Sequence, residues 1–93
     1  MIKNFKCKET QKIFRRQYSR KLPSGIQKAA FRKLRMINRS YTLSDLKVPP
    51  ANRLEMLTGK RKGQYSILIN DQRRICFRWI ENNALDVEIT DYH

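Results

Sequence analysis

The chain ends in Asp91-Tyr92-His93, three adjacent side chains that carry a carboxylate, a phenol and an imidazole. His93 is the only histidine, and imidazole is the side chain that exchanges protons most readily near neutral pH. A frayed terminus is the alternative interpretation of such a tripeptide. No glycine or proline separates it from the apolar-rich stretch before it, so we expect the three residues to continue a strand and take part in catalysis.

The charge of the chain indicates what such chemistry would act on. The formal net charge is +13, and all 21 lysines and arginines lie within residues 1–80. The segment after residue 80 contains four acidic residues and no Lys or Arg. A strongly cationic body ending in a short acidic strand attracts polyanions. We therefore expect a nucleic acid or an acidic protein as partner.

Three groups of cations are candidates for contact with a polyanion. Lys60, Arg61 and Lys62 stand between two glycines, which allow the backbone to approach phosphates closely; a solvated hairpin loop is the alternative. Lys28, Arg32, Lys33, Arg35 and Arg39 recur on one side of an expected helix, and we expect that side to bind RNA or an acidic partner rather than to be merely solvated. Arg53, Arg73 and Arg78 complete the set expected to contact RNA or the ribosome.

Arg74 is expected near the start of a strand, beside strand carboxylates at Asp86 and Glu88. An ordinary ion pair with either acid would account for it. The functional alternative is stabilisation of a pentacovalent phosphate, because the guanidinium fork matches two phosphoryl oxygens.

The elements that must position these residues follow from the hydrophobic period. We expect a helix from Thr10, as its cap, to about Tyr18, and a second from Ser24 to about residue 38, with Ser24 and Gln27 as a capping box. Ile2 and Phe5 suggest an edge strand, and residues 41–46 one more helical turn. The period then changes to 2, and four strands are expected at Leu54–Leu57, Tyr65–Ile69, Arg74–Trp79 and Leu85–Ile89.

This order predicts an α+β fold, with two N-terminal helices packed on a twisted, mainly antiparallel sheet. Alternation within the strands places Ile75, Phe77, Trp79, Leu85, Val87 and Ile89 under the helices. The open face is then expected to present Arg74, Arg78, Asp86, Glu88 and Tyr92.

The remaining composition favours one small cytosolic domain spanning residues 1–93. The sequence shows neither a signal peptide nor an apolar run long enough to cross a membrane. Cys7 and Cys76 are isolated and are expected to act as small hydrophobic residues. We expect no metal site and no cofactor.

Three stretches together resemble the HigB toxins of the RelE/ParE superfamily. They are Asn52-Arg53-Leu54-Glu55-x-Leu57-x-Gly59-x-Arg61-x-Gly63, then Tyr65-Ser66-Ile67-x-Ile69-Asn70-x-Gln72-x-Arg74-Ile75-Cys76-Phe77, and finally Val87-Glu88-Ile89-x-Asp91-Tyr92-His93. With Met1-Ile2-x-x-Phe5 they cover nearly the whole chain. Three positions differ from common family residues: Glu55 replaces a histidine, Thr58 a lysine and Arg73 an aromatic residue.

The resemblance implies a compact microbial ribonuclease-like fold and a metal-independent mRNA interferase that cleaves translated mRNA in the ribosomal A site, contacting small-subunit RNA. It also implies neutralisation by a HigA-type helix-turn-helix antitoxin, the pair together binding operator DNA. Arg74, Asp91, Tyr92 and His93 match family active-site positions. RNA cleavage needs a base and an acid, so we expect His93 to be one of these and Glu55 or Asp91 the other.

Two other functions fit the same composition. A ParE-like toxin would inhibit a topoisomerase by binding alone, on the same fold. A non-catalytic nucleic-acid-binding module would depend only on the cationic body. The terminal Asp-Tyr-His favours the nuclease, since neither binder needs proton-transfer groups at that position.

Overall fold

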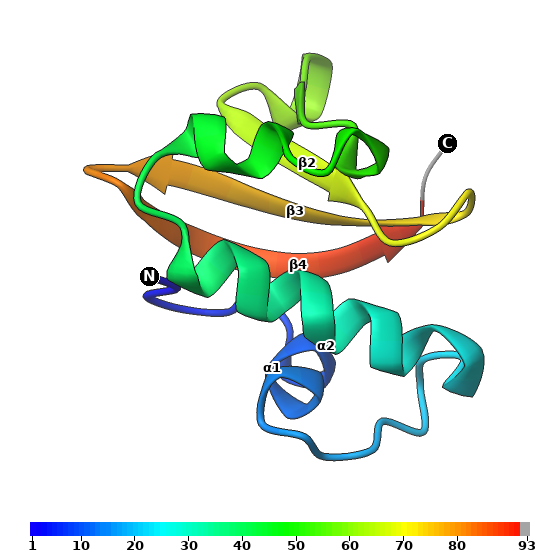
Figure 1. Cartoon of the computed structure of the whole chain (residues 1–93). Coiled ribbons are helices and arrows are strands. Elements are labelled where there is room, and N and C mark those ends of the chain that lie inside the picture. Colours follow the sequence, from blue (N-terminus) through cyan, green and yellow to red (C-terminus); the bar gives the residue numbers. More distant parts are fainter. Residues whose placement is uncertain (92–93) are drawn as a thin grey trace.

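The computed structural model describes residues 1–91, and its elements form an α+β arrangement (Figure 1). In chain order they are α1 (Lys8–Phe14), α2 (Ser24–Arg39), the short 3-10 helices η1 (Leu43–Lys47) and η2 (Pro50–Asn52), β1 (Glu55–Met56), the 3-10 turn η3 (Gly59–Arg61), β2 (Gln64–Leu68), β3 (Arg73–Ile80) and β4 (Asn83–Asp91). The four strands make one antiparallel sheet in the order β1-β2-β3-β4. The predicted fold class is confirmed.

The core lies between the sheet and α2, which runs across one face of it (Figure 1). The buried residues of α2 recur at helical spacing, and the strands supply alternate residues: the set includes Ile26, Ala30, Leu34, Ile37, Ile67, Ile75, Phe77 and Val87. Each large apolar side chain buried in this way stabilises the fold by about 1.5–3 kcal/mol. Within residues 1–91, none of the helices has both the length and the apolar character needed to cross a bilayer.

The first helix is shorter than expected, because α1 ends at Phe14 and does not reach Tyr18. Arg16 has a φ of 63°, in the left-handed region that a right-handed helix cannot continue through. Its N–H still bonds the carbonyl of Ile13 at 3.0 Å, which closes the helix end. The chain then turns away, and Tyr18 is exposed.

Two side chains expected to cap helices bind elsewhere. Thr10 lies inside α1, and its hydroxyl accepts a 3.0 Å hydrogen bond from the N–H of Ile89 in β4. Ser24 makes no capping bond. Gln27 accepts from the N–H of Ser19 at 3.1 Å and donates to its carbonyl at 2.7 Å. Thr10 therefore joins α1 to β4, and Gln27 joins α2 to the loop that follows α1.

A β-bulge changes which residues of β4 face the helices. The register pairs Cys76 with Glu88 and Arg78 with Leu85, so one residue of β3 is opposed by two of β4, Asp86 and Val87. Asp86 takes a φ of 52° at this point. The expected inward set of Leu85, Val87 and Ile89 is therefore wrong in its first member: Leu85 lies opposite Arg78, and Ala84 is buried in its place.

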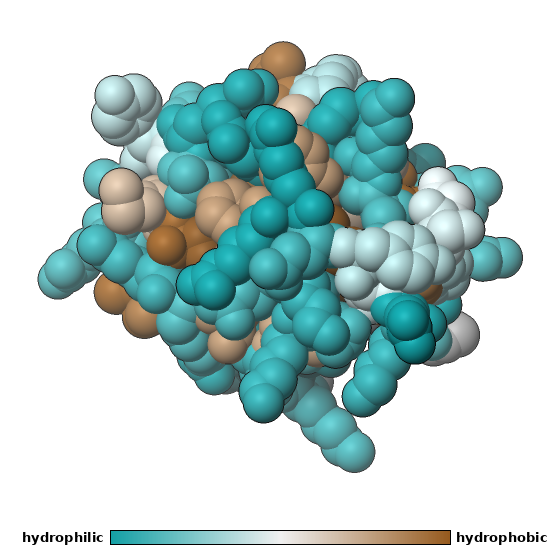
Figure 2. All heavy atoms as spheres, turned by 90° about the horizontal axis from the view of Figure 1, so that it is seen from below, coloured by the Kyte–Doolittle hydropathy of each residue, from teal (hydrophilic) through white to brown (hydrophobic). Residues whose placement is uncertain are grey.

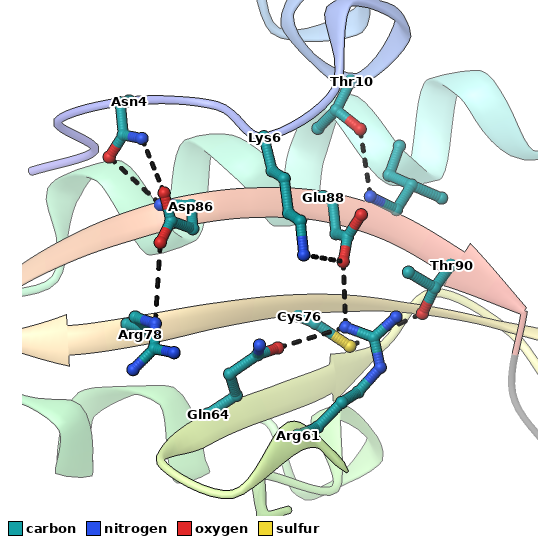
Figure 3. Close-up of polar contacts among 11 residues, drawn as sticks. Asn4, Lys6, Thr10, Arg61, Gln64, Cys76, Arg78, Asp86, Glu88 and Thr90 are labelled. Atoms are coloured by element: carbon teal, nitrogen blue, oxygen red, sulfur yellow. Dashed lines mark hydrogen bonds and ion pairs between the residues drawn. The ribbon is translucent and has the colours of Figure 1, made fainter.

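The N-terminal segment runs beside β4 and meets the bulge. Ile2 and Phe5 form isolated parallel bridges with Ala84 and Val87 rather than a full edge strand. Between them, the amide of Asn4 donates to Asp86 Oδ1 at 2.8 Å and accepts from the Asp86 N–H at 3.1 Å (Figure 3). This pair of bonds holds the left-handed residue in place.

Candidate functional site

The face of the sheet away from α2 carries the polar residues of β3. Arg74, Cys76 and Arg78 alternate with Ile75 and Phe77, which belong to the core, and Cys76 is itself buried. Arg74 lies between Leu68 of β2 and Thr90 of β4. Thr90 is the residue before Asp91, at which β4 ends. The sheet thus places Arg74 near the carboxyl end of β4, where sequence reasoning expected the site.

Glu55 belongs to the same face. It opposes Ser66 of β2, which in turn opposes Cys76 of β3. Glu55 is exposed, and Arg74 lies two strands across and two residues along from it. The fold therefore brings together two of the predicted catalytic residues on one open surface.

Asp91 ends β4 in an ion pair with Arg73. The two residues are Cα partners, and Arg73 Nη1 lies 3.0 Å from Asp91 Oδ1. By strand alternation this pair belongs to the opposite side of the sheet from Arg74. Asp91 is therefore placed to hold the end of the strand. The predicted roles of Tyr92 and His93 concern residues outside the described range.

Arg61 is turned onto the sheet rather than toward solvent. Its Nη1 donates to Glu88 Oε1 at 2.8 Å and to Gln64 Oε1 at 3.1 Å, and Figure 3 shows the guanidinium lying across β3 beside Cys76. The hydrogen bond to Glu88 raises the pKa of Arg61 above its usual value. Lys60 and Lys62, the other two predicted loop cations, are exposed. The loop therefore offers two free-standing lysines beside one internally bonded arginine.

Asp86 and Glu88, the two acids considered as ion-pair partners of Arg74, lie beside other cations. Arg78 Nε lies 3.5 Å from Asp86 Oδ2, and Lys6 Nζ lies 3.9 Å from Glu88 Oε1, the same oxygen that Arg61 contacts (Figure 3). Sequence reasoning did not single out Lys6, Asn4 or Gln64. Of these, only Gln64 could have been found from the sequence, because it stands two residues before Ser66 and so lies on the same polar side of β2.

The other predicted RNA-binding residues occupy two further places. Arg53 is exposed, with a left-handed φ of 47°, and lines a hollow of about 430 Å³ beside the β2–β3 turn. Lys28 and Arg32 project from α2, on the side of the molecule opposite the open sheet face. Lys33 turns inward to bond Asn52 Oδ1, and burial lowers its pKa. The cations of α2 and Arg74 therefore lie on different sides of the molecule and do not form one surface.

Metal ligands do not gather in the described part of the chain. Among residues 1–91, no three His, Cys, Asp or Glu side chains lie close enough together to form a metal-binding cluster. The polar groups of the open face are instead guanidinium, carboxylate, hydroxyl and thiol groups paired across the strands, with Cys76 Sγ 3.4 Å from Thr90 Oγ1. Such a surface can bind a phosphate through its cations.

Comparison with known proteins places nearly the whole chain in one family. A model of the RelE-like toxins of the type II toxin–antitoxin system HigB matches residues 3–93. Toxin HigB-1 of Vibrio cholerae serotype O1 is 45% identical over 67 residues, 72% of this chain and 70% of that protein. An uncharacterized protein of Haemophilus influenzae is 42% identical over 73 residues, 78% and 71% of the two chains. Since the family match leaves out only the first two residues, this chain belongs to the HigB-like toxins of type II toxin–antitoxin systems.

Proposed function

We propose that this toxin is an endoribonuclease that cleaves mRNA on translating ribosomes in the cytoplasm. One observation carries the proposal: Arg74 and Glu55 share the open sheet face, and β4 runs past Arg74 to the Arg73–Asp91 pair. Tyr92 and His93 follow Asp91 directly in the sequence. We infer that Arg74 as the phosphate-binding cation, Glu55 as a carboxylate and His93 as the histidine act on one RNA phosphate.

The chemistry is a transfer within the RNA strand. A base removes the proton of a 2′-hydroxyl, the resulting oxygen attacks the adjacent phosphorus, and the bond from phosphorus to the 5′-oxygen breaks as an acid protonates that oxygen. His93 serves as one of these two groups, and Glu55, the carboxylate on Arg74's face, as the other. Each proton-transfer group contributes about 10²–10⁴ in rate.

The other residues bind and position the RNA. Arg74 stabilises the negative charge that grows on the phosphoryl oxygens, and Tyr92 stacks on a base. Asp91 holds the end of β4 through Arg73. Lys60, Lys62, Arg53 and Arg78 contact mRNA or small-subunit RNA, and the ribosome supplies much of the alignment by holding the mRNA.

The decisive experiment is cleavage of a defined mRNA by the purified toxin, with and without programmed ribosomes. We expect cuts within translated codons only when ribosomes are present. Arg74→Ala, Glu55→Gln and His93→Ala should each slow cleavage by about 10²-fold or more. Lys47→Ala, a change of an exposed cation on η1, is the matched control and should cleave normally.

Two outcomes would reject the proposal. Full activity in all three site variants would remove this face from the chemistry. Growth arrest without any mRNA cleavage, together with inhibition of topoisomerase supercoiling, would support a ParE-like binder. Independence from metal is tested with a phosphorothioate at the cleaved phosphate, because thiophilic metal ions should then fail to restore the rate.

The toxin also requires an antitoxin, as every type II system does. We propose a HigA-type protein with a helix-turn-helix, through which the toxin–antitoxin complex binds operator DNA. Co-purification of the toxin with the product of the adjacent reading frame tests this pairing. Operator binding by the toxin in the absence of that protein would contradict it.

A further inference from the structure

A hollow of about 430 Å³ opens beside the turn that joins β2 to β3. We call it the turn pocket, and its lining residues are Ala51, Arg53, Leu68, Ile69, Asn70 and Asp71. One wall comes from η2 and the residue after it, and the other comes from the end of β2 and the turn. Pockets of roughly 300–1,000 Å³ are typical of small-molecule sites, so the turn pocket has room for a single nucleobase.

The turn pocket lies next to Arg74, the residue proposed to bind the cleaved phosphate. Leu68, in the wall of the pocket, is the Cα partner of Arg74, so the two side chains share one face of the sheet. Paired strands lie about 4.8 Å apart. A base held in the pocket and a phosphate held by Arg74 are therefore close enough to belong to one nucleotide or to two neighbouring ones.

Arg53 and Asp71 give the turn pocket one cation and one carboxylate, and the fold uses neither. Both residues are exposed. Within residues 1–91, their side chains make no ion pair or hydrogen bond, either with each other or with a neighbour. Asp86, Glu88 and Asp91, by contrast, each lie beside an arginine. A cation and an acid that line one hollow without pairing leave their hydrogen-bonding groups available to a ligand.

The backbone on each side of the turn pocket is fixed. Arg53 has a left-handed φ of 47°, and its N–H closes η2 on the carbonyl of Pro50 at 3.0 Å. On the other wall, Asn70 Oδ1 accepts hydrogen bonds from the N–H groups of Gln72 at 2.9 Å and Arg73 at 2.8 Å. Side chains attached to such fixed segments bind a ligand at a smaller entropic cost.

We propose that the turn pocket selects guanine beside the cleaved phosphate, an inference that rests on the proposed mRNA cleavage. Guanine carries two adjacent acceptors, O6 and N7, which match the paired N–H groups of the Arg53 guanidinium. On another edge its N1–H and 2-amino groups donate, and they match the two carboxylate oxygens of Asp71. Leu68 and Ile69 supply apolar contact with the ring.

The other bases fit this pair of side chains less well. Adenine presents an amino group where guanine has O6, and an acceptor at N1. Its amino group then faces the guanidinium and its N1 faces the carboxylate, so donors meet donors and acceptors meet acceptors. Pyrimidines have no N7 for the arginine to contact. Each correct bidentate pair discriminates against a wrong base by about 5- to 150-fold.

Hollows elsewhere on the surface lack either the carboxylate or the position. Figure 2 views the molecule from the side of α1 and α2, where hydrophilic side chains surround small hydrophobic patches. The described residues that line the two hollows there include several cations and no Asp or Glu, so these hollows attract phosphates without distinguishing bases. Arg39 and Glu81 line a further hollow, but it borders the β3–β4 turn, at the opposite end of the ladder from Arg74.

The test measures base preference rather than overall activity. Ribosomes are programmed with mRNAs that differ only in carrying G, A, C or U at either nucleotide flanking the mapped cleavage site, and initial rates are read by primer extension. We expect the unchanged toxin to cleave beside G at least roughly tenfold faster than beside any other base. D71N and R53Q should each slow cleavage beside G by roughly tenfold and leave cleavage beside A within about threefold.

A modified base and a matched variant sharpen the assignment. Inosine lacks the 2-amino group of guanine, so the unchanged toxin should cleave beside it roughly tenfold more slowly than beside G, whereas D71N should distinguish the two by no more than about threefold. E81Q makes the corresponding change of an exposed acid to its amide at the far end of the β3–β4 hairpin and should keep the full preference for G.

The possible results separate base selection from mRNA cleavage itself. Equal cleavage beside the four bases, or a preference for G that D71N retains, would overturn the turn pocket and leave the nuclease intact. If the unchanged toxin cuts no mRNA on ribosomes, both proposals are wrong. Because Arg53 and Asp71 make no bonds within the described chain, D71N and R53Q should unfold at the same urea concentration as the unchanged toxin, which excludes misfolding as the cause of a lost preference.

Discussion

Arg61 Nη1 lies 2.8 Å from Glu88 Oε1 and thereby joins two residues that are 27 positions apart in the sequence. The bond fastens the basic loop to the middle of β4, across β3 and over the buried Cys76. One of the three loop cations thus organises the open face from within. The two lysines that flank it, Lys60 and Lys62, remain exposed. Arg61 therefore stabilises the fold, while the lysines on either side of it are available to bind RNA.

This pair should contribute measurably to stability. The Glu88 side chain is only 16% exposed and that of Arg61 31%, so the bond is partly shielded from water. We expect Arg61→Ala and Glu88→Gln each to lower the free energy of unfolding by about 1–3 kcal/mol. The double variant should lose less than the sum of the two, by about 1 kcal/mol, in urea denaturation. Strict additivity would mean that the two side chains do not interact in solution.

The same division predicts how the loop responds to salt. Lys60→Ser and Lys62→Ser should each flatten the dependence of log affinity on log salt by about 0.7 to 0.9, the value for one lost phosphate contact. Arg61→Ser should leave this slope nearly unchanged, because its guanidinium is bonded to Glu88 and Gln64. The measurement is equilibrium binding to ribosomes across a KCl series. A slope lowered equally by all three changes would show that Arg61 leaves Glu88 to bind RNA.

Much of the fold was predictable because local pattern and tertiary packing agree. In α2 a single apolar stripe at helical spacing becomes the buried side, so the helix was found almost to the residue. The strands followed from period 2 and from turn residues such as Asn82, whose φ is 61°. β1 was expected at Leu54–Leu57 and is only Glu55–Met56, because propensity does not determine how far pairing extends.

The errors have a common physical origin in contacts between distant segments. The bulge at Asp86 is held by two hydrogen bonds with the side chain of Asn4, which is 82 residues away. No local pattern in the sequence of β4 predicts it. Gln27 was assigned to a capping box but bonds Ser19 in the preceding loop. For the site, alternation along β3 put Arg74 and Arg78 on the open face. The place of Glu55 on that face and the Arg61–Glu88 bond needed the three-dimensional fold.

Acid should weaken the fold through Asp45. Its carboxylate accepts hydrogen bonds from the N–H groups of Tyr41 at 2.9 Å and Thr42 at 3.0 Å, and these bonds lower the pKa of Asp45 below its usual 3.8. A pKa that falls on folding stabilises the native state above the unfolded pKa, and this stabilisation is lost as the pH drops through the folded value. Asp45→Asn should therefore be less stable than the unchanged chain at neutral pH and equally stable below both pKa values. Urea unfolding at a series of pH values tests this, and a difference independent of pH would assign the effect to something other than ionisation.

The Arg73–Asp91 pair offers a test of how the end of β4 is held. Its two side chains are 26% and 56% exposed, so the pair itself should contribute no more than about 1 kcal/mol to global stability. Its local effect should be larger: Arg73→Asp should speed amide hydrogen exchange in the last residue pairs of the β3–β4 ladder. It should also lower mRNA cleavage by roughly tenfold, because the strand that leads to Tyr92 and His93 loses its anchor. The exchanged pair R73D/D91R restores the opposite charges and should recover most of both losses. Recovery of exchange protection without cleavage would mean that Asp91 itself takes part in proton transfer, and recovery of neither would show that the pair does not anchor the strand.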